Sequence, residues 1–292
     1  DAVIIFSNID MLVSLNTEIL HDLSAEMSKS VNDRMFGSIF WAKIAFFNAY
    51  KPYCMGFEKS VEHIAHLKEN DNFFSTLLRL ALADPLSRGL PLNAWLIKPV
   101  QRLMKYPLLL AELLKTMPAD HPDIPLLRKS TDAITAVVDE INELKRHQEN
   151  QEKITSIQMS FLNFFWGDEL QLVQPRRKFV LEGKYSRGFK GAAYFYLFND
   201  CIVLGRMVGR SFIVSRAAKL KTITAIKQNK TKPEKLLLTM GDKEKLHMNF
   251  NTTEEKMTFL KEFLVNRQRS IQRGQDDSMI STRSSIALFA PK

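Results

Sequence analysis

The first half of the chain carries apolar residues at steps of three and four, which is the period of an amphipathic helix. These positions are Ile5, Ile9, Leu12, Leu15, Ile19 and Leu23 near the start, and Ile134, Val137, Val138, Ile141 and Leu144 further on. Asp71 or Asn72 can cap a helix that stops at Pro85, whereas Pro52 and Gly56 are expected to interrupt the helical segment around them. We therefore predict an all-α helical bundle over residues 1–163.

Near residue 164 the pattern changes to an alternation of apolar and polar residues, which is typical of β-strands. The segments are short, rich in β-branched and aromatic residues, and include "KFVLEGKYS", "AAYFYLFNDCIVLGRM" and "EKLLLTMG". A helical pattern returns in "NTTEEKMTFLKEFLVNRQ", with Asn251 or Thr252 as its N-cap. We predict a β-barrel or sandwich of about six or seven strands over residues 164–268, capped by one C-terminal helix. Residues 269–292 are rich in Ser and Arg and are predicted to form a tail.

The composition narrows the choice of partner without deciding it. The 292 residues include 41 Lys and Arg against 32 Asp and Glu, a formal net charge of +9. This charge suits nucleic acid, a membrane surface or an acidic protein face. Nucleic acid is not expected, because no helix-turn-helix or RNA-binding signature is present and the basic residues are spread out. Cys54 and Cys201 stand far apart, which argues against a disulfide framework or a zinc site and favours the cytosol.

Several other functions lack their sequence signatures. The six histidines are scattered, and no Gly-rich phosphate loop or Ser/His/Asp arrangement is present, so we expect no metal, no cofactor and no hydrolase. No apolar run reaches the roughly 18 residues of a membrane span, and "DAVIIFSNID" lacks the charged flank of a signal peptide. Because the chain does not begin with Met, we expect it to be a fragment.

The stretch from Leu92 to Lys115, "LNAWLIKPVQRLMKYPLLLAELLK", combines a helical pattern with prolines. Pro99 suits a first turn, but Pro107 lies inside the pattern, where it removes a backbone hydrogen bond to Leu103 and predicts a kink. One face of the projected helix is polar and mainly basic, and the opposite face is apolar. The polar face holds Lys98, Gln101, Arg102, Lys105, Leu109 and Glu112, and the apolar face holds Ile97, Val100, Met104, Leu108, Ala111 and Leu114. Such a helix is either a core helix with a solvated face or a surface that docks another protein.

The run "LIKPVQRLMKYPLLLAELL" closely resembles the signature of the Dbl homology domain, the catalytic module of guanine nucleotide exchange factors for Rho-family GTPases. "IIFSNIDMLVSLNTEILHDL" is similar to the family's second helical region, and "DAITAVVDEINELKR" is similar to its last helix. The β-rich part, with "RKFVLEG" and "YFYLFNDCIVLG", resembles the pleckstrin homology domain that almost always follows. The resemblance extends from Ile4 to about Arg267.

This resemblance implies an exchange factor that makes no covalent bond, binds a Rho, Rac or Cdc42 type GTPase, remodels its switch regions and promotes GDP release. In the family a lysine of the "KYPLLL" run and an asparagine of the "INE" run face the second switch, and the matching residues are Lys105 and Asn142. Gln101 and Leu109 are expected as neighbouring contacts, although Leu109 also suits the core. The alternative is a non-catalytic adaptor that binds a GTPase or targets a membrane.

The sequence departs from the family pattern at its beginning. The family opens with a helix carrying a Thr-Glu pair, whose glutamate contacts the first switch, and no such helix is found here. Thr17 and Glu18 form the dipeptide within the second helical region, so Glu18 is not expected to take that role. Either the opening helix has been removed from this chain or this member lacks it. In the second case the module would bind a GTPase without catalysing exchange.

The resemblance also implies a phosphoinositide site. Pleckstrin homology domains gather Lys and Arg around the loop between their first two strands, where this chain has Lys184, Arg187 and Lys190. Each basic residue near an acidic membrane surface contributes about 1 kcal/mol. Because the family's order of basic residues is incomplete here, we expect weak, unselective binding and a cytoplasmic protein that is peripheral at the membrane. A domain that only braces the bundle is the alternative. Phe259 stands where the family has a core tryptophan.

Overall fold

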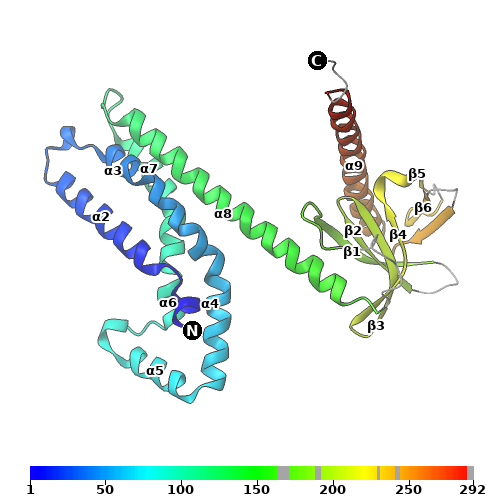
Figure 1. Ribbon diagram of the computed structural model, residues 1–292, viewed down its shortest axis with the longest axis horizontal. Helices are drawn as coiled ribbons and strands as arrows, with labels where there is room; N and C mark the ends of the chain where they lie inside the picture. Colours follow the sequence, from blue (N-terminus) through cyan, green and yellow to red (C-terminus); the bar gives the residue numbers. More distant parts are fainter. Residues whose placement is uncertain (163–170, 188–191, 229–230, 241–243, 288–292) are drawn as a thin grey trace. The chain divides into compact units, whose positions relative to one another are not determined.

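The chain folds into two compact units. The computed structural model describes residues 1–287 apart from 163–170, 188–191, 229–230 and 241–243. The units are Asp1–His147 and Gln148–Lys292. The division falls inside helix α8 (Ile124–Met159), labelled in Figure 1, so the C-terminal part of that helix belongs to the second unit. The predicted boundary, residue 163, lies after the end of this helix.

The first unit is a bundle of α-helices, as the apolar pattern predicts. Its helices are α1 (Ala2–Phe6), α2 (Ile9–Met27), α3 (Phe36–Lys43), α4 (Tyr50–Asn70), α5 (Asn72–Ala83), α6 (Leu92–Leu96), α7 (Lys98–Thr116) and the first part of α8, with the short 3-10 helices η1 (Val31–Asp33), η2 (Ile44–Ala49) and η3 (Pro85–Ser87) between them. The Asp71 carboxylate accepts hydrogen bonds from the amides of Phe73 and Phe74, at 2.8 and 3.0 Å. This residue therefore caps α5, as expected.

Aromatic side chains lie at the centre of the bundle. Tyr106 of α7 is buried and packs edge-on against Phe40 of α3 and Phe47 of η2, with ring centroids 5.6 and 5.4 Å apart. The buried residues around them are Leu12, Leu15, Ile19, Tyr50, Tyr53, Cys54, Leu103, Leu110, Leu127, Ile134, Val137 and Ile141. One core thus joins α2, α3, α4, α7 and α8.

Helix α3 approaches α8 closely at Gly37. A Cβ atom on this residue would lie 2.3 Å from the backbone nitrogen of Leu127 and 2.7 Å from its Cα atom. The Gly37 amide also donates a 2.6 Å hydrogen bond to the buried carboxylate of Asp123, which immediately precedes α8. The crossing of the two helices therefore requires glycine for reasons of space.

Two expectations for the bundle need correction. Pro52 and Gly56 do not interrupt a helix, because α4 runs through both and Pro52 lies in its first turn, where amide groups lack partners within the helix. Among the described residues, the stretch Ala2–Met27 is long and apolar enough to cross a membrane by length and composition, although the sequence predicts no such run. In the bundle, Leu12 and Ile19 of this stretch pack into the core.

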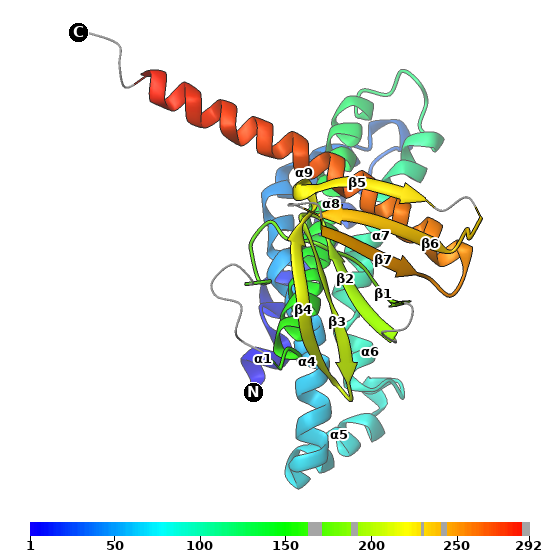
Figure 2. The ribbon, with the colours of Figure 1, turned by 90° about the vertical axis from the view of Figure 1, so that its right-hand side faces the viewer.

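The second unit is an antiparallel sheet followed by a helix, as the change of period predicts. Its strands are β1 (Phe179–Ser186), β2 (Ala192–Phe198), β3 (Cys201–Val208), β4 (Ser211–Lys219), β5 (Ile223–Gln228), β6 (Lys235–Met240) and β7 (Glu244–Asn249), with the short η6 (Leu220–Thr222) before β5. The seven strands follow the order β4-β3-β2-β1-β7-β6-β5 (Figure 2). Because β4 and β5 are its two edges, the sheet is not closed into a barrel, which agrees with the sandwich alternative.

Helix α9 (Thr253–Ala287) covers the sheet and completes its core. The Thr252 hydroxyl accepts a 3.1 Å hydrogen bond from the Glu255 amide, and the Glu255 carboxylate accepts one of 3.1 Å from the Asn251 amide. The Thr252 hydroxyl thus caps the helix, which confirms the predicted start. Phe259 is fully buried, with its ring centroid 4.9 Å from that of Phe195, so it fills the position expected for a core aromatic residue.

Helix α9 extends past residue 268, where the sequence predicts the end of the domain. The helix continues through residues 269–287, in the segment that the sequence predicts as a Ser- and Arg-rich tail. Starting a helix is costly, whereas extending one adds a hydrogen bond for each residue fixed. A segment of weak periodicity can therefore continue a helix whose first turns are fixed by the core.

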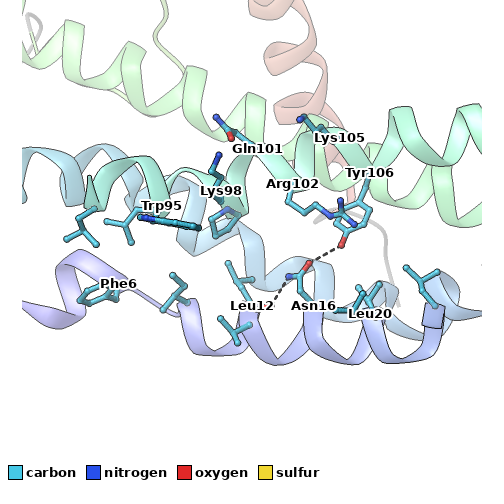
Figure 3. Close-up of a pocket in the computed structure, with 17 residues that line it drawn as sticks. Phe6, Leu12, Asn16, Leu20, Trp95, Lys98, Gln101, Arg102, Lys105 and Tyr106 are labelled. Atoms are coloured by element: carbon cyan, nitrogen blue, oxygen red, sulfur yellow. Dashed lines mark hydrogen bonds between the residues drawn. The ribbon is translucent and has the colours of Figure 1, made fainter. Parts of the chain in front are cut away.

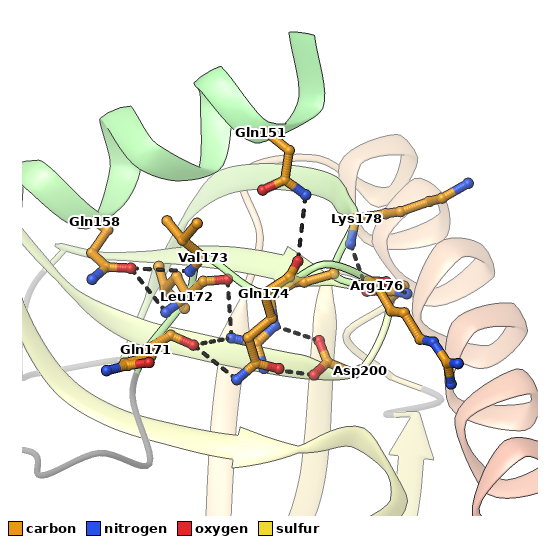
Figure 4. A network of polar contacts seen from close by, with 11 residues as sticks. Gln151, Gln158, Gln171, Leu172, Val173, Gln174, Arg176, Lys178 and Asp200 are labelled. Atoms are coloured by element: carbon orange, nitrogen blue, oxygen red, sulfur yellow. Dashed lines mark hydrogen bonds and ion pairs between the residues drawn. The ribbon is translucent and has the colours of Figure 1, made fainter. Parts of the chain in front are cut away.

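Polar side chains anchor the segment between α8 and β1 (Figure 4). Arg177 is buried and donates to both carboxylate oxygens of Asp200, at 2.8 and 2.6 Å, and to the carbonyl of Gln171 at 2.7 Å. Burial has the largest single effect on Arg177 and lowers its pKa, but the hydrogen bonds to Asp200 and the charges of Cys201 and Asp200 together outweigh it and raise the pKa of the guanidinium. Gln158 of α8 accepts from the amide of Leu172 at 3.0 Å. These contacts hold the segment through its main chain.

Candidate functional site

Helix α7 carries most of the residues predicted to contact a GTPase. Pro99 lies in its first turn, where a missing amide costs little, but Pro107 lies inside and deprives the Leu103 carbonyl of its usual donor, at a cost of about 3 kcal/mol. Packing offsets that cost, because Leu103, Tyr106 and Leu110 are buried in the bundle core. The position of α7 therefore depends on its buried side chains.

The exposed side of α7 is the predicted polar face. Its exposed residues are Lys98, Gln101, Arg102, Lys105, Leu109 and Glu112. Within the described part of the chain, no ion pair involves Lys98, Arg102 or Lys105. No carboxylate of the described residues therefore neutralises these three cations.

The buried side of α7 agrees with the predicted apolar face only in part, because Val100, Met104 and Leu114 pack against the core but Leu108 does not. Leu108, which was assigned to that face, is 71% exposed. The buried residues Leu103, Tyr106 and Leu110 form a neighbouring stripe instead. Because three leucines follow Pro107, the sequence does not show which of them faces the core. The packing of the Tyr106 ring against two phenylalanines determines which side of α7 is buried.

Asn142 occupies an exposed position on α8. It follows Ile141, which is buried in the same core as Leu103 of α7. Nearby on α8, Glu140 binds Lys51 of α4 at 2.6 Å. The structure thus places Asn142 on the surface of the same packed framework that carries α7.

A groove separates α7 from the first helices of the bundle (Figure 3). It has a volume of about 710 Å³. One wall consists of Phe6, Ile9, Val13, Asn16, Leu20 and Leu23, and the other includes Leu92, Trp95 and Leu96 of α6 and Pro99, Arg102 and Tyr106 of α7. Leu20 is 65% exposed in this groove. Helix α2 thus has one apolar side in the core and a second apolar side in the groove. An apolar helix face is normally covered, but no described residue covers this second side.

Polar groups lie at the floor and the rim of the groove. Gln101 and Lys105 are at the rim, where they point away from α2 in Figure 3. At the floor, the Tyr106 hydroxyl donates to Asn16 Oδ1 at 2.9 Å, and Asn16 Nδ2 donates to the Tyr50 hydroxyl at 2.8 Å. Burial raises the pKa of Tyr50 to about 12, so this hydroxyl stays protonated. The groove therefore combines apolar walls, a neutral polar floor and a basic rim.

The basic residues predicted to bind phosphoinositide belong to β1 and the segment after it in the second unit. Lys184 is exposed on β1 and lines a pocket of about 490 Å³ together with Glu254 at the start of α9. Arg187 follows the end of β1 and donates to the Ser215 hydroxyl of β4 at 2.8 Å. Lys190 lies outside the described residues. Lys184 and Arg187 thus have different neighbours, and the lipid site stays a prediction.

The described residues contain neither a metal-binding cluster nor a reactive thiol. Within the described residues, no group of three or more His, Cys, Asp or Glu side chains could hold a metal ion. Both cysteines are buried, and burial raises the pKa of the Cys54 thiol to about 11 and that of the Cys201 thiol well above its ordinary range. Since the thiolate is the nucleophile, neither cysteine is reactive at neutral pH.

Comparison with known proteins identifies the bundle. Residues 1–142 match the family model of the RhoGEF domain. Residues 1–142 of this chain are a RhoGEF domain. Its relatives include the Myosin-M heavy chain of Dictyostelium discoideum, 34% identical over 62% of this chain and 10% of that protein. Rac guanine nucleotide exchange factor B of the same organism is 33% identical over 57% of this chain and 14% of that protein. The RhoGEF chain thus spans a small part of the length of these relatives.

Both units of the RhoGEF chain also match solved structures. The DH/PH domains of PDZ-RhoGEF, crystallised in complex with RhoA activated by GTPγS, superpose with a TM-score of 0.70 over 91% of this chain and 82% of that chain. Their sequence identity is 17%, so the similarity establishes the fold alone. The bundle and the sheet therefore have the Dbl homology and pleckstrin homology folds.

Thr17 and Glu18 lie outside the groove of the RhoGEF domain. The Glu18 carboxylate accepts a 2.5 Å hydrogen bond from Lys43 of α3, and neither Thr17 nor Glu18 lines the groove. This position gives no support to a role for Glu18 in place of the glutamate of the family's opening helix.

Sequence reasoning missed the groove and Asn16 at its floor. The signal is present, because the groove residues from Phe6 to Leu23 recur at helical steps beside the stripe that enters the core. A helix with two apolar stripes predicts two covered sides. Sequence reasoning also missed Ser215, the partner of Arg187, because residues on different strands carry no local signal of their contact.

Proposed function

We propose that this RhoGEF chain is a guanine nucleotide exchange factor for Rho-family small GTPases, which promotes GDP release and GTP loading. The proposal rests on one observation above all, the exposed face of α7 on a RhoGEF domain, where Lys98, Arg102 and Lys105 form no ion pair with the described residues. The similarity of the fold to DH/PH domains that bind RhoA supports it. One relative points the same way, since it is named as an exchange factor for Rac.

Such an exchange factor acts by binding and forms no covalent bond. It binds the nucleotide-free GTPase more tightly than the loaded one, and linkage requires that it weaken nucleotide binding by the same factor. Each tenfold effect corresponds to about 1.4 kcal/mol of differential binding. The surface must be rigid to express that difference, and the single core that joins α2, α4, α7 and α8 supports this requirement.

Lys105 and Asn142 are the proposed contacts to the second switch of the GTPase, with Gln101 and Leu109 beside Lys105. Gln101, Lys105 and Leu109 follow one another at steps of one helical turn on the exposed side of α7. This row offers an amide, a charge and an apolar side chain. Leu109 is 50% exposed, so a partner can still bury a large part of its surface.

We propose further that the groove receives the opening helix that the family has and this sequence lacks. The apolar walls and the basic rim suit an amphipathic helix whose polar flank is acidic. A helix in this position would carry its Thr-Glu pair beside α7. Without it, the chain is proposed to bind a GTPase but to release GDP slowly, which is the behaviour of the adaptor alternative.

For the second unit we propose weak, unselective binding to acidic membrane surfaces, which would place a cytoplasmic protein at the membrane periphery. The guanidinium of Arg187 supports this proposal, whereas the glutamate beside Lys184 weakens it at that position. Sedimentation with vesicles of phosphatidylserine and phosphoinositide tests it. Arg187→Ala should reduce the bound fraction more than Lys184→Ala, and equal binding of both variants and the parent chain would contradict the proposal.

Release of a fluorescent GDP analogue from Rho, Rac and Cdc42 proteins tests the exchange function. The chain is assayed as it stands and with an upstream extension. Lys105→Ala and Asn142→Ala should each slow release from the GTPase that responds. Lys59→Ala is the matched control, because Lys59 is an exposed lysine on α4, and it should leave the rate unchanged. Binding of nucleotide-free GTPase without any acceleration, for both chain lengths, would leave the adaptor function instead.

A further inference from the structure

Asn16 is a polar residue in the apolar α2 wall of the groove, and its side chain is fully engaged. Its Nδ2 group donates to the carbonyl of Leu12 at 2.7 Å and to the hydroxyl of Tyr50 at 2.8 Å, while its Oδ1 accepts from Tyr106 at 2.9 Å. One side chain of α2 therefore connects α4 and α7 at the floor of the groove (Figure 3). A half-buried amide with all these partners fixes their mutual positions more strictly than apolar contact alone.

Tyr106 is the member of this group that belongs to α7. Its ring is almost completely buried between Phe40 and Phe47, and the guanidinium of Arg102 stacks on it at 4.7 Å from the ring centroid. A buried tyrosine hydroxyl needs a hydrogen-bond partner, and Asn16 supplies it. The rotation of α7 about its axis is thus set at Tyr106.

The proposed contact residues depend on this rotation because of their place in the helix. Lys105 immediately precedes Tyr106, and Gln101 lies one turn earlier, on the same exposed face. Pro107 follows at once and interrupts the backbone hydrogen bonding of α7. The part of α7 that carries Gln101 and Lys105 therefore relies on tertiary contacts for its orientation, and the contact between Asn16 and Tyr106 is a directional one.

We infer that Asn16 is a positioning residue for GTPase binding, which acts through Tyr106 on Lys105 and Gln101 and touches no atom of the GTPase itself. A surface whose contact residues are already oriented loses less freedom on binding. The inference rests on the proposed function, since it concerns the same face of α7. It adds to that site a residue of α2, Asn16, which lies outside the α7 motif and is only partly exposed.

The test measures the affinity of variants for nucleotide-free GTPase by calorimetry or fluorescence titration. Tyr106→Phe removes one hydroxyl and keeps the ring, and it should raise Kd about threefold to tenfold, the range expected when one net hydrogen bond is lost. Asn16→Leu should have an effect of similar size, and the double variant should bind no more weakly than either single one. Asn16→Asp keeps an acceptor for the Tyr106 hydroxyl and should restore part of the affinity.

The control separates positioning from loss of stability. Tyr53→Phe makes the same chemical change in the same core, where the Tyr53 hydroxyl donates to the Leu96 carbonyl at 2.7 Å. It should lower Tm by a similar amount and leave Kd unchanged. In the Lys105→Ala background, Tyr106→Phe should cause a smaller loss than in the parent chain, because only the part of its effect exerted through Gln101 remains.

Each outcome decides the inference. Wild-type affinity in Tyr106→Phe, an equal loss in Tyr53→Phe, or independent losses from Lys105→Ala and Tyr106→Phe would each overturn the positioning role while leaving the proposed function in place. A parent chain that binds no nucleotide-free GTPase overturns both proposals. Binding without acceleration of GDP release overturns the exchange function alone, and the affinities of the variants still decide the role of Asn16.

Discussion

Leu20 on α2 offers a sharp test of whether the groove receives a helix. Its side chain is 65% exposed in the groove. Complete burial of a leucine side chain is worth about 1.5–3 kcal/mol, so covering this exposed part would contribute about 1–2 kcal/mol. In the chain as it stands, Leu20→Lys should change the free energy of unfolding little, because the lysine remains largely in water.

The same substitution should be costly once the groove is occupied. In a polypeptide extended before Asp1, Leu20→Lys would lose the burial of the leucine and place an ammonium group between two apolar helix faces. We expect a loss of about 2–4 kcal/mol in that case, measured by urea unfolding of the bundle. Met11→Lys is the control, because Met11 is 59% exposed on the same helix and does not line the groove. An equally small effect of Leu20→Lys in both chain lengths would refute the seating of a helix in the groove.

Three further predictions concern the framework that supports the site. Gly37→Ala should lower the Tm of the bundle and its free energy of unfolding by about 1–3 kcal/mol or more, because the added methyl group would lie 2.3 Å from the backbone nitrogen of Leu127. An unchanged Tm would contradict the close crossing of α3 and α8. Arg177→Met should destabilise the second unit by about 1–3 kcal/mol in urea unfolding, since Asp200 loses its partner; a stability equal to that of the parent chain would refute this. Burial raises the pKa of Cys54 to about 11 from the ordinary 9.0. The neutral thiol therefore contributes fully to the free energy of unfolding below pH 9, and this contribution is lost as pH rises toward 11. Unfolding free energies measured between pH 8 and 11 should fall in the parent chain and fall less in Cys54→Ala, and a rise over this window would show that the sign is wrong.

The order of elements could be predicted from the sequence because each depends on local signals. The change of hydrophobic period locates the transition from bundle to sheet, and Asp71 and Thr252 begin their helices by capping, a contact between residues close in sequence. The exposed face of α7 was also predictable, since Gln101 and Lys105 are polar residues on one side of a helix. These features need no knowledge of what the elements pack against.

The features that could not be predicted depend on tertiary packing. The buried stripe of α7 is selected by the fit of Tyr106 between rings from other helices, whereas the run of leucines leaves several phases open. Lys184 and Arg187 are close in sequence but are directed to different surroundings by the strand and by Ser215. The hydrogen bond between Asn16 and Tyr106 joins residues ninety positions apart, and no local pattern encodes it.

The central claim is that this RhoGEF chain prefers the nucleotide-free GTPase, and a comparison of two affinities tests it most directly. Kd is measured by calorimetry for one Rho-family GTPase in its nucleotide-free form and in its GDP-loaded form with Mg²⁺. The account predicts that the nucleotide-free form binds at least about a hundredfold more tightly, a difference of about 2.7 kcal/mol. Equal affinities for the two forms would contradict the account, because a protein that binds both forms of the GTPase equally does not change the equilibrium between them.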